Sequence, residues 1–345
     1  MGVKIAIHFR KGSYSDRWIE YCTEHGVDYT LVNCYESDII RRLASTDALL
    51  WHWTHASPED VLCAARVLRA AEALGLTVFP NTATCWHYDD KVAQKYLLEA
   101  IGARLVPTYV FYDRGSALEW IAGATFPKVF KLSRGAASHN VRLVRRAAAA
   151  RRLAKQAFGK GFKPVAGLLR DAGTKARKHR AKRDVLATLK RLPGTMANLR
   201  RVRRAMARER GYVYFQDYLP GNTSDTRISV VGKRAWGYRR LVRKGSFRAS
   251  GSGVMDYDPG GVDLECVRMA FRVTETLGLQ SAAFDFIFDA AGRPQIVEMS
   301  YAFGLAFAPN VTGYWDPGLE WHDERVYPQD AILLDLLEQV RGRGA

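Results

Sequence analysis

The sequence contains few cysteines, and they form no recognisable pattern. Its 345 residues include five cysteines, which are scattered along the chain without a CxxC pair. An odd, unclustered set argues against a disulfide scaffold and a zinc site, and is typical of a reducing compartment. The sequence also lacks a serine nucleophile elbow and a Cys–His pair in a supporting context, so covalent nucleophilic catalysis is not indicated.

Long apolar runs are missing as well. The apolar stretch at residues 5–7 is too short for the core of a signal peptide. The longest run without a charge, residues 299–315, is interrupted by Gly304, Pro309 and Gly313 and will not span a bilayer. We therefore expect a cytoplasmic protein, at most peripheral to the inner face of a membrane.

Positive charge is concentrated in one segment. The chain has 52 Lys and Arg against 35 Asp and Glu, a net charge of +17. Residues 142–210 hold 23 of the basic residues and three acids, so this segment carries +20 and the rest of the chain −3. Its composition favours helix, and it has few of the aromatic residues that single-strand nucleic-acid binders use.

Two explanations of this basic segment stay open. The first is a solvated helical insertion whose charge serves solubility. The second is a docking site for a polyanion, because so many like charges repel one another. Among polyanions we favour an anionic substrate or a membrane surface over nucleic acid, since no nucleic-acid-binding motif accompanies the segment.

Strands and helices alternate over the first 80 residues. The pattern predicts strands at 3–9, 27–32, 48–53 and 77–80, and helices at 16–25, 36–44 and 58–74. This alternation indicates a small parallel α/β domain. No GxGxxG follows the first strand, so a dinucleotide site is not indicated.

The pattern changes from residue 89 onward. We expect helices at 90–100, 116–122, 261–277 and 329–341, and strands at 108–112, 127–132 and 141–144. Five further strands, at 212–218, 225–231, 234–242, 283–288 and 295–299, are expected to form one antiparallel sheet. The predicted division is an α/β domain (1–85), a second subdomain (86–144), the basic insertion (145–210) and a C-terminal subdomain (211–345).

Two carboxylates lie within apolar strands. Asp285 is flanked by phenylalanines, and Glu298 follows Ile296 and Val297. A buried carboxylate is costly unless a cation compensates it. Because a short turn joins the two strands, the carboxylates are expected to come close together, which suits a Mg²⁺ site for nucleotide phosphates. The alternative is a pair of acids facing solvent on an edge hairpin.

The carboxyl ends of the first strands are the expected entrance for substrate groups, at residues 10–15 and 51–55. His52 and His55 lie in this region without a third metal ligand nearby. We therefore expect a structural pair of histidines rather than a metal site.

The order of motifs resembles the ATP-grasp superfamily and, within it, carboxylate–amine ligases such as glutathione synthetase and the ribosomal-protein glutamate ligases. The resemblance covers residues 1–340 except the basic insertion. It rests on NTATCWHYDDK, LLEAIGARLVPTYV, FPKVFKLSRGAASHNVRLV, VYFQDYLPGNTSDTRISVVGKRAWGYRR, FRAS and FDFIFDAAGRPQIVEMSYAFG. It implies an α/β (α+β) ATP-grasp fold with a Rossmann-like N-terminal domain, interrupted by the basic helical insertion that the composition predicts.

The resemblance also implies roles for individual residues in binding ATP. Lys91 and Lys131 match the lysines that contact the nucleotide. The hinge whose backbone hydrogen-bonds adenine matches Gln216, Asp217 and Tyr218, and Asp225 falls near the ribose position.

Further roles concern the phosphates and the metal. The arginines that hold phosphates and the acyl-phosphate intermediate match Arg227, Arg239, Arg240 and Arg248, although strand alternation turns either Arg239 or Arg240 away. The resemblance places Mg²⁺ on Asp285, Glu298 and Ser300.

The implied activity is an ATP-dependent ligase that forms an amide bond from a carboxylate and an amine through an acyl phosphate. Its substrates would be small molecules, glycans or peptides, and the resting state a homodimer. Ser300 and Ser250 stand where relatives have asparagine, and the loop 133–140 has one glycine. These departures keep two alternatives open: an ATP-grasp kinase acting on a sugar or polyol hydroxyl, and a degenerate ATP-binding regulatory protein.

Overall fold

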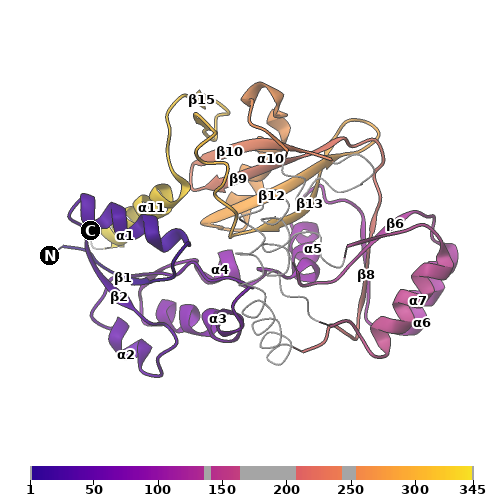
Figure 1. The fold of residues 1–345 in the computed structure, drawn as a ribbon, viewed down its shortest axis with the longest axis horizontal. Coiled ribbons are helices and arrows are strands. Elements are labelled where there is room, and N and C mark those ends of the chain that lie inside the picture. Colours follow the sequence, from indigo (N-terminus) through magenta and orange to yellow (C-terminus); the bar gives the residue numbers. More distant parts are fainter. Residues whose placement is uncertain (1, 136–140, 164–206, 243–253, 344–345) are drawn as a thin grey trace, which may run out of the picture.

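Three β-sheets organise the part of the chain that the structure describes. The computed structural model describes residues 2–135, 141–163, 207–242 and 254–343. In Figure 1 the first sheet lies at one end of the molecule beside both termini, the second lies at the other end, and the third lies between and above them. Within the described residues, no helix combines the length and the apolar character needed to cross a membrane.

The first sheet confirms the predicted small parallel α/β domain. Its four parallel strands run in the order β2 (Asp28–Val32), β1 (Lys4–His8), β3 (Ala48–Leu50), β4 (Thr77–Phe79). The connecting helices are α1 (Tyr14–Glu24), α2 (Ile39–Leu43) and α3 (Pro58–Ala73), and Ser13 and Ser57 cap the amino ends of α1 and α3. β3 ends three residues earlier than predicted, because a tight turn brings the Trp53 N–H to the Trp51 carbonyl.

The second sheet is antiparallel, with strand order β5–β8–β6–β7. The bounds are β5 (Thr108–Phe111), β6 (Lys128–Lys131), β7 (Arg142–Val144) and β8 (Val213–Asp217), and the helices α6 (Arg114–Gly123) and α7 (Ala147–Phe158) pack against it. α7 confirms helix at the start of the basic segment; residues 164–206 of that segment lie outside the described residues.

One predicted pairing is wrong. The strand at 212–218 was expected in the large C-terminal sheet, but β8 lies between β5 and β6. Alternation sends Val213 and Phe215 into the core beneath α6 and α7, where Phe215 contacts Phe130 and Trp120. This apolar face accounts for the pairing of β8 within the second sheet, since its core lies beneath α6 and α7. The large sheet buries its own apolar residues against a different helix.

The third sheet confirms the other predicted antiparallel strands. Its order is β13 (Pro294–Ser300), β12 (Ser281–Phe288), β9 (Ser224–Val231), β10 (Arg234–Leu241), β14 (Tyr314–Trp315), β15 (Trp321–His322), with β11 (Met255–Asp256) paired to β10. One face packs against α10 (Leu264–Thr276) and α5 (Lys91–Ala100), where Ile228, Phe284 and Phe286 are buried. The residues that alternate with these apolar ones along β9 and β12 therefore lie on the opposite face of the sheet.

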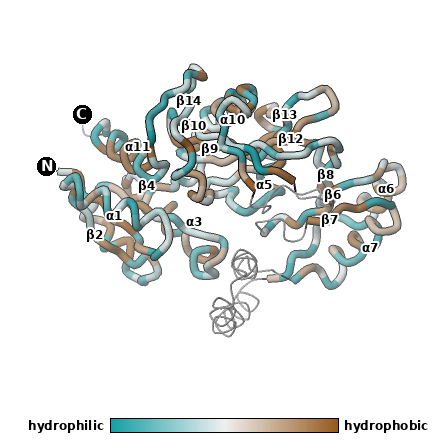
Figure 2. Tube along the Cα trace, turned by 45° about the horizontal axis from the view of Figure 1, so that its top comes forward, coloured by the Kyte–Doolittle hydropathy of each residue, from teal (hydrophilic) through white to brown (hydrophobic). Residues whose placement is uncertain are grey.

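The chain ends by returning to the first sheet. α11 (Pro328–Arg343) contacts α1 and β4, while the short elements α4 (Thr82–Cys85) and a 3₁₀ turn (Pro259–Gly261) complete the described elements. Figure 2 shows hydrophobic and hydrophilic residues alternating along α11, as expected of a helix with one face on a core. Arg17 on α1 binds Asp330 on α11 through two hydrogen bonds of 2.8 Å. The predicted domain boundaries stay predictions.

Candidate active site

A buried chain of alternating charges crosses three strands of the third sheet. Arg227 on β9 donates from Nε and Nη2 to the two carboxylate oxygens of Asp285 on β12, at 2.7 and 2.9 Å. Arg240 on β10 donates from Nε and Nη2 to Asp225 at 2.6 Å each, and its Nη2 forms an ion pair with Oδ2 of Asp285 at 2.7 Å. We call Arg227, Asp285, Arg240 and Asp225 the charge ladder.

The charge ladder keeps Asp285 ionised. Burial by itself raises the pKa of this carboxyl, but the Arg227 and Arg240 guanidiniums outweigh burial and hold it well below its usual range. Paired, doubly hydrogen-bonded arginines are the donors that make a buried carboxylate tolerable. The site therefore holds a permanent anion between two permanent cations.

The two predicted metal-binding carboxylates are brought together. Asp285 and Glu298 are directly opposite one another on β12 and β13, and a register shift follows Asp285. Each oxygen of the Asp285 carboxylate accepts one hydrogen bond from Arg227, and Oδ2 also forms the ion pair with Arg240, so Oδ1 retains a free lone pair. Glu298 is one-third exposed, and Oε2 lies 3.7 Å from Nζ of Lys91.

Ser300, the third predicted metal ligand, lies on the same side of β13 as Glu298 by strand alternation. Its hydroxyl donates to the Ala302 carbonyl at 2.7 Å, so only its lone pairs remain for a metal. Two carboxylates and a neutral oxygen form a hard-oxygen donor set that fits Mg²⁺.

Lys131 is the most unusual cation of the site. It is 4% exposed, and its Nζ has no hydrogen-bond partner among the described residues. Burial lowers the pKa of its ammonium to about 8, although the carboxylates of Glu298 and Asp285 favour the charged form. A buried donor without a partner is costly and indicates a place for an anionic ligand.

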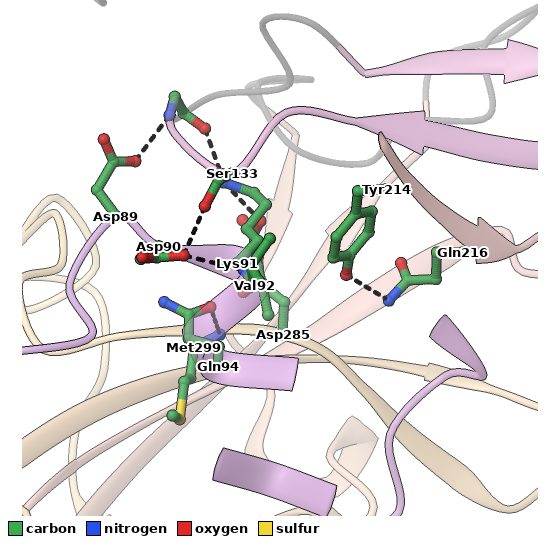
Figure 3. A network of polar contacts seen from close by, with 12 residues as sticks. Asp89, Asp90, Lys91, Val92, Gln94, Ser133, Tyr214, Gln216, Asp285 and Met299 are labelled. Carbon is green, nitrogen blue, oxygen red and sulfur yellow. Dashed lines mark hydrogen bonds and ion pairs between the residues drawn. The ribbon is translucent and has the colours of Figure 1, made fainter. Parts of the chain in front are cut away.

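Lys91 begins α5 and is already engaged. Its Nζ donates to the Gly135 carbonyl at 2.9 Å, and its backbone N–H donates to the Ser133 carbonyl at 3.1 Å. Asp90 caps the helix and also accepts from the Ser133 hydroxyl at 2.5 Å, while Asp89 accepts from the Gly135 N–H at 2.8 Å (Figure 3). The start of the loop 133–140 is thus tied to residues 89–91; residues 136–140 lie outside the described part.

The predicted adenine hinge lies at the end of β8. The Gln216 side chain donates to Thr108 Oγ1 at 3.0 Å and to the Tyr214 hydroxyl at 3.4 Å, the latter seen in Figure 3. Asp217 forms an ion pair with Lys128, and its N–H donates to the Pro107 carbonyl at 2.9 Å. Tyr218 follows directly. Protein groups thus already engage the side chains of Gln216 and Asp217 and the Asp217 N–H, and the adenine hinge stays a prediction.

Sequence reasoning missed Lys128. This lysine is buried on β6 opposite Asp217 and lies 5.1 Å above the Tyr109 ring. Alternation places it on the α6 side of the sheet and Lys131 on the side of the charge ladder. A charged residue in an apolar strand that faces an acid in the next strand was the available signal.

Strand alternation also separates Arg239 from Arg240 as predicted. Arg240 is buried in the charge ladder, whereas Arg239 is partly exposed and pairs with Asp256 of β11. Arg248 and Ser250 lie outside the described residues. His52 and His55 have protein partners, respectively the Tyr14 N–H and the Tyr88 hydroxyl, as expected of structural histidines.

Comparison with known proteins identifies the fold. No protein-family model and no curated protein matches the chain. A RimK domain ATP-grasp protein from Sphaerobacter thermophilus is 15% identical with a TM-score of 0.57, over 97% of this chain and all of that one (100%). D-cycloserine synthetase DcsG is 16% identical with a TM-score of 0.53, over 97% and 100% of the two chains.

A third solved structure gives the same result. The D-alanine–D-alanine ligase from Bacillus anthracis, complexed with ATP, is 14% identical with a TM-score of 0.54, over 99% of each chain. This chain therefore has the ATP-grasp fold, as the order of its motifs predicted. At sequence identities this low, structural similarity establishes the fold alone, and the activity depends on the chemistry of the site.

Replacing Lys131 should stabilise the ligand-free protein. Lys131→Met should raise the free energy of unfolding at pH 7 by about 1–3 kcal/mol, because methionine fills similar space without burying an ammonium. The folded-state pKa near 8 lies below the usual 10.5, so this gain should fade as the pH rises from 8 to 10.5.

Urea unfolding at pH 7 and pH 10 measures this effect, with Lys233→Met in the exposed turn between β9 and β10 as the control. If the free energy of unfolding of Lys131→Met is equal to or lower than that of the wild type, the prediction is wrong, and groups in the folded protein already stabilise the charge of the Lys131 ammonium.

Proposed function

We propose that this protein is an ATP-dependent carboxylate–amine ligase that forms an amide bond through an acyl phosphate. The observation that carries the proposal is the buried, unpartnered ammonium of Lys131 facing the acid pair Asp285 and Glu298. A triphosphate with its divalent cation satisfies both features together. Two of the fold neighbours are a D-alanine–D-alanine ligase solved with ATP and a D-cycloserine synthetase.

In this proposal each residue of the site has one role in binding ATP, holding the metal or stabilising phosphoryl transfer. Lys131 and Lys91 bind phosphate oxygens, Gln216 to Tyr218 hold adenine and Asp225 lies near the ribose. Mg²⁺, bound by Asp285, Glu298 and Ser300, would neutralise phosphate charge. Arg227 and Arg240, together with Arg248, stabilise the transferring phosphoryl group, a task of positioning and charge neutralisation that requires no protein nucleophile.

The proposed reaction has two steps. A substrate carboxylate oxygen attacks the γ-phosphorus of ATP, the bond to the β-phosphate oxygen breaks, and ADP leaves. The amine then attacks the carbonyl carbon of the acyl phosphate, phosphate leaves, and the amine loses a proton. Holding both substrates beside the charge ladder supplies most of the rate enhancement.

One observation favours a second candidate, an ATP-binding regulatory protein. Ser300 stands where the relatives have asparagine, and a neutral hydroxyl oxygen is a weaker Mg²⁺ ligand than an amide carbonyl oxygen. ADP release measured with panels of carboxylates, amines and sugars separates the candidates. Dependence on a carboxylate and an amine means ligase, dependence on a hydroxyl means kinase, and tight ATP binding without turnover means regulator.

The acid pair can be tested directly. Glu298→Gln keeps the shape of the side chain and removes its charge, so ADP formation should fall by roughly two to three orders of magnitude. Circular dichroism should show an unchanged fold. Glu338→Gln, at an exposed position of α11, is the matched control. Near-normal ADP formation by folded Glu298→Gln would refute the metal assignment.

The two lysines should contribute unequally to nucleotide binding. Lys131→Met should raise the Kd for ATP by about 10–100-fold, the range of a charge-assisted hydrogen bond. Lys91→Met should have a smaller effect, because Nζ of Lys91 already binds Gly135. Isothermal titration calorimetry measures both values. Wild-type affinity in Lys131→Met would remove this lysine from the nucleotide site.

We also propose that the basic segment, residues 142–210, docks an anionic substrate or membrane surface beside this site. Its described ends meet in a bridge in which Phe162 and Glu209 exchange backbone hydrogen bonds of 2.8 and 3.0 Å. The Tyr212 hydroxyl donates to Glu209 and accepts the Ser133 N–H at 2.6 Å. The base of the segment thus lies two hydrogen bonds from Ser133, at the start of the loop 133–140.

Neutralising the segment should affect the partner and spare ATP. Glutamine at Lys175, Arg177, Lys178, Arg180, Lys182 and Arg183 should leave the Kd for ATP unchanged, and should raise the KM of the anionic substrate or abolish binding to anionic vesicles. Wild-type binding should weaken steeply with salt. If the KM of the anionic substrate and the binding to anionic vesicles are the same in this variant and in the wild type at every salt concentration, the segment serves solubility alone. The homodimer stays a prediction, which light scattering measures.

A further inference from the structure

The first sheet has a topological switch point between β1 and β3. All its strands are parallel, and the order β2–β1–β3–β4 reverses direction at that pair. In parallel α/β sheets, ligands bind outside the carboxyl ends of the strands at such a point. The segments that follow the two strands are residues 9–13 and 51–57.

Arg10 occupies this switch point and is held from several sides. Its Nη2 donates to the His52 carbonyl at 2.8 Å and lies 3.4 Å from Nδ1 of the same histidine. Its backbone N–H donates to the Ser15 hydroxyl at 3.0 Å, and its carbonyl accepts from the Ser13 N–H at 3.1 Å. The guanidinium is therefore oriented before any ligand arrives, which lowers the entropic cost of binding.

The charge of Arg10 is left without a counter-ion. Across residues 2–135, 141–163, 207–242 and 254–343, no carboxylate lies within ion-pair distance of it, and its Nε is buried without a hydrogen-bond partner. Burial together with Arg10 lowers the pKa of His52 to about 3 and that of His8 to about 4, so both rings are neutral.

The buried acid Asp60 does not act as the counter-ion of Arg10. Asp60 is almost fully buried, and its two oxygens accept from the Tyr35 hydroxyl at 2.6 Å and the Thr54 N–H at 2.7 Å. Both oxygens of the Asp60 carboxylate are therefore engaged in holding residues 51–57. An oriented cation with unfilled donors beside neutral imidazoles is a receptor for an anion.

The Arg10 segment is clamped to the catalytic sheet. The Tyr14 hydroxyl donates to the Phe303 carbonyl at 2.7 Å and accepts the Phe303 N–H at 3.1 Å, and the Tyr14 ring stacks on His52 with centroids 3.7 Å apart. The Tyr301 hydroxyl donates to the Trp53 carbonyl at 2.6 Å. Residues 301 and 303 lie one and three positions after Ser300, so both segments at the switch point are anchored next to the end of β13.

We propose that Arg10 binds a carboxylate that a substrate carries in addition to its reacting group. The substrate that enters here is then an amino acid whose amine reacts and whose carboxylate stays free. A guanidinium matches a carboxylate through two parallel hydrogen bonds. This proposal rests on the ligase function, since it names one of that reaction's two substrates.

The test measures binding and turnover separately. Thermal shift assays of the wild type with the ATP analogue AMP-PNP and Mg²⁺ use a panel of amino acids, their carboxamides, and the dicarboxylates succinate and glutarate. We expect an amino acid to stabilise the protein and its carboxamide to fail. In Arg10→Met this discrimination should vanish, the KM of that amino acid should rise about 10–100-fold, and kcat should change little.

Two controls separate the possible failures. Arg10→Lys should recover part of the affinity, and Arg41→Met, an exposed arginine on α2, should behave as the wild type does. Stabilisation by a dicarboxylate alone, retained discrimination in Arg10→Met, or no carboxylate-dependent shift with any probe would each overturn the proposal. AMP-PNP binding and ADP release by the wild type judge the ligase function independently of these results.

Discussion

The fold of the site depends on one buried carboxylate, Asp285, which requires two guanidiniums to be tolerable. β12 supplies the acid, and its neighbours β9 and β10 supply Arg227 and Arg240. Removing one partner of such a buried pair typically costs about 3–5 kcal/mol, so the register of these strands is set by charge as well as by apolar packing. Because side chains alternate, the same register places the apolar residues of these strands under α10 and leaves the opposite face free for chemistry.

Lys131 shows the reverse situation, a buried charge that the folded chain leaves unsatisfied. Every member of the charge ladder has protein partners, whereas Nζ of Lys131 has none among the described residues. A protein selected for stability alone would place methionine or leucine there. The two kinds of charge differ in what completes them: the ions of the charge ladder are satisfied by the protein and hold three strands together at the proposed site, and the unsatisfied ion marks where a ligand completes the structure.

The sequence predicted those features that depend on neighbouring residues. Alternating strands and helices identified the parallel domain, and the short turn between two apolar strands placed Asp285 opposite Glu298. The partner of β8 was predicted wrongly, because its alternating pattern suits either antiparallel sheet and the choice depends on distant packing of Phe215 beneath α6 and α7. The Asp285 ion pairs and the isolation of Arg10 were equally invisible, since each depends on which strands become neighbours.

The first and third sheets share one apolar cluster, and tyrosine hydroxyl groups add hydrogen bonds to the backbone. Tyr14 bonds to Phe303 and Tyr301 to Trp53 between these two sheets, while Tyr212 bonds to Ser133 at the ends of β8 and β6 within the second sheet. Such bonds have a defined direction, while apolar packing alone tolerates sliding of one layer over another. Each of these bonds ends beside a segment that the proposed reaction uses: the Arg10 segment, residues 51–57 and the start of the loop 133–140. Two of the tyrosines therefore hold segments of the first sheet against the end of β13, and the third fixes the start of the loop that follows Lys131.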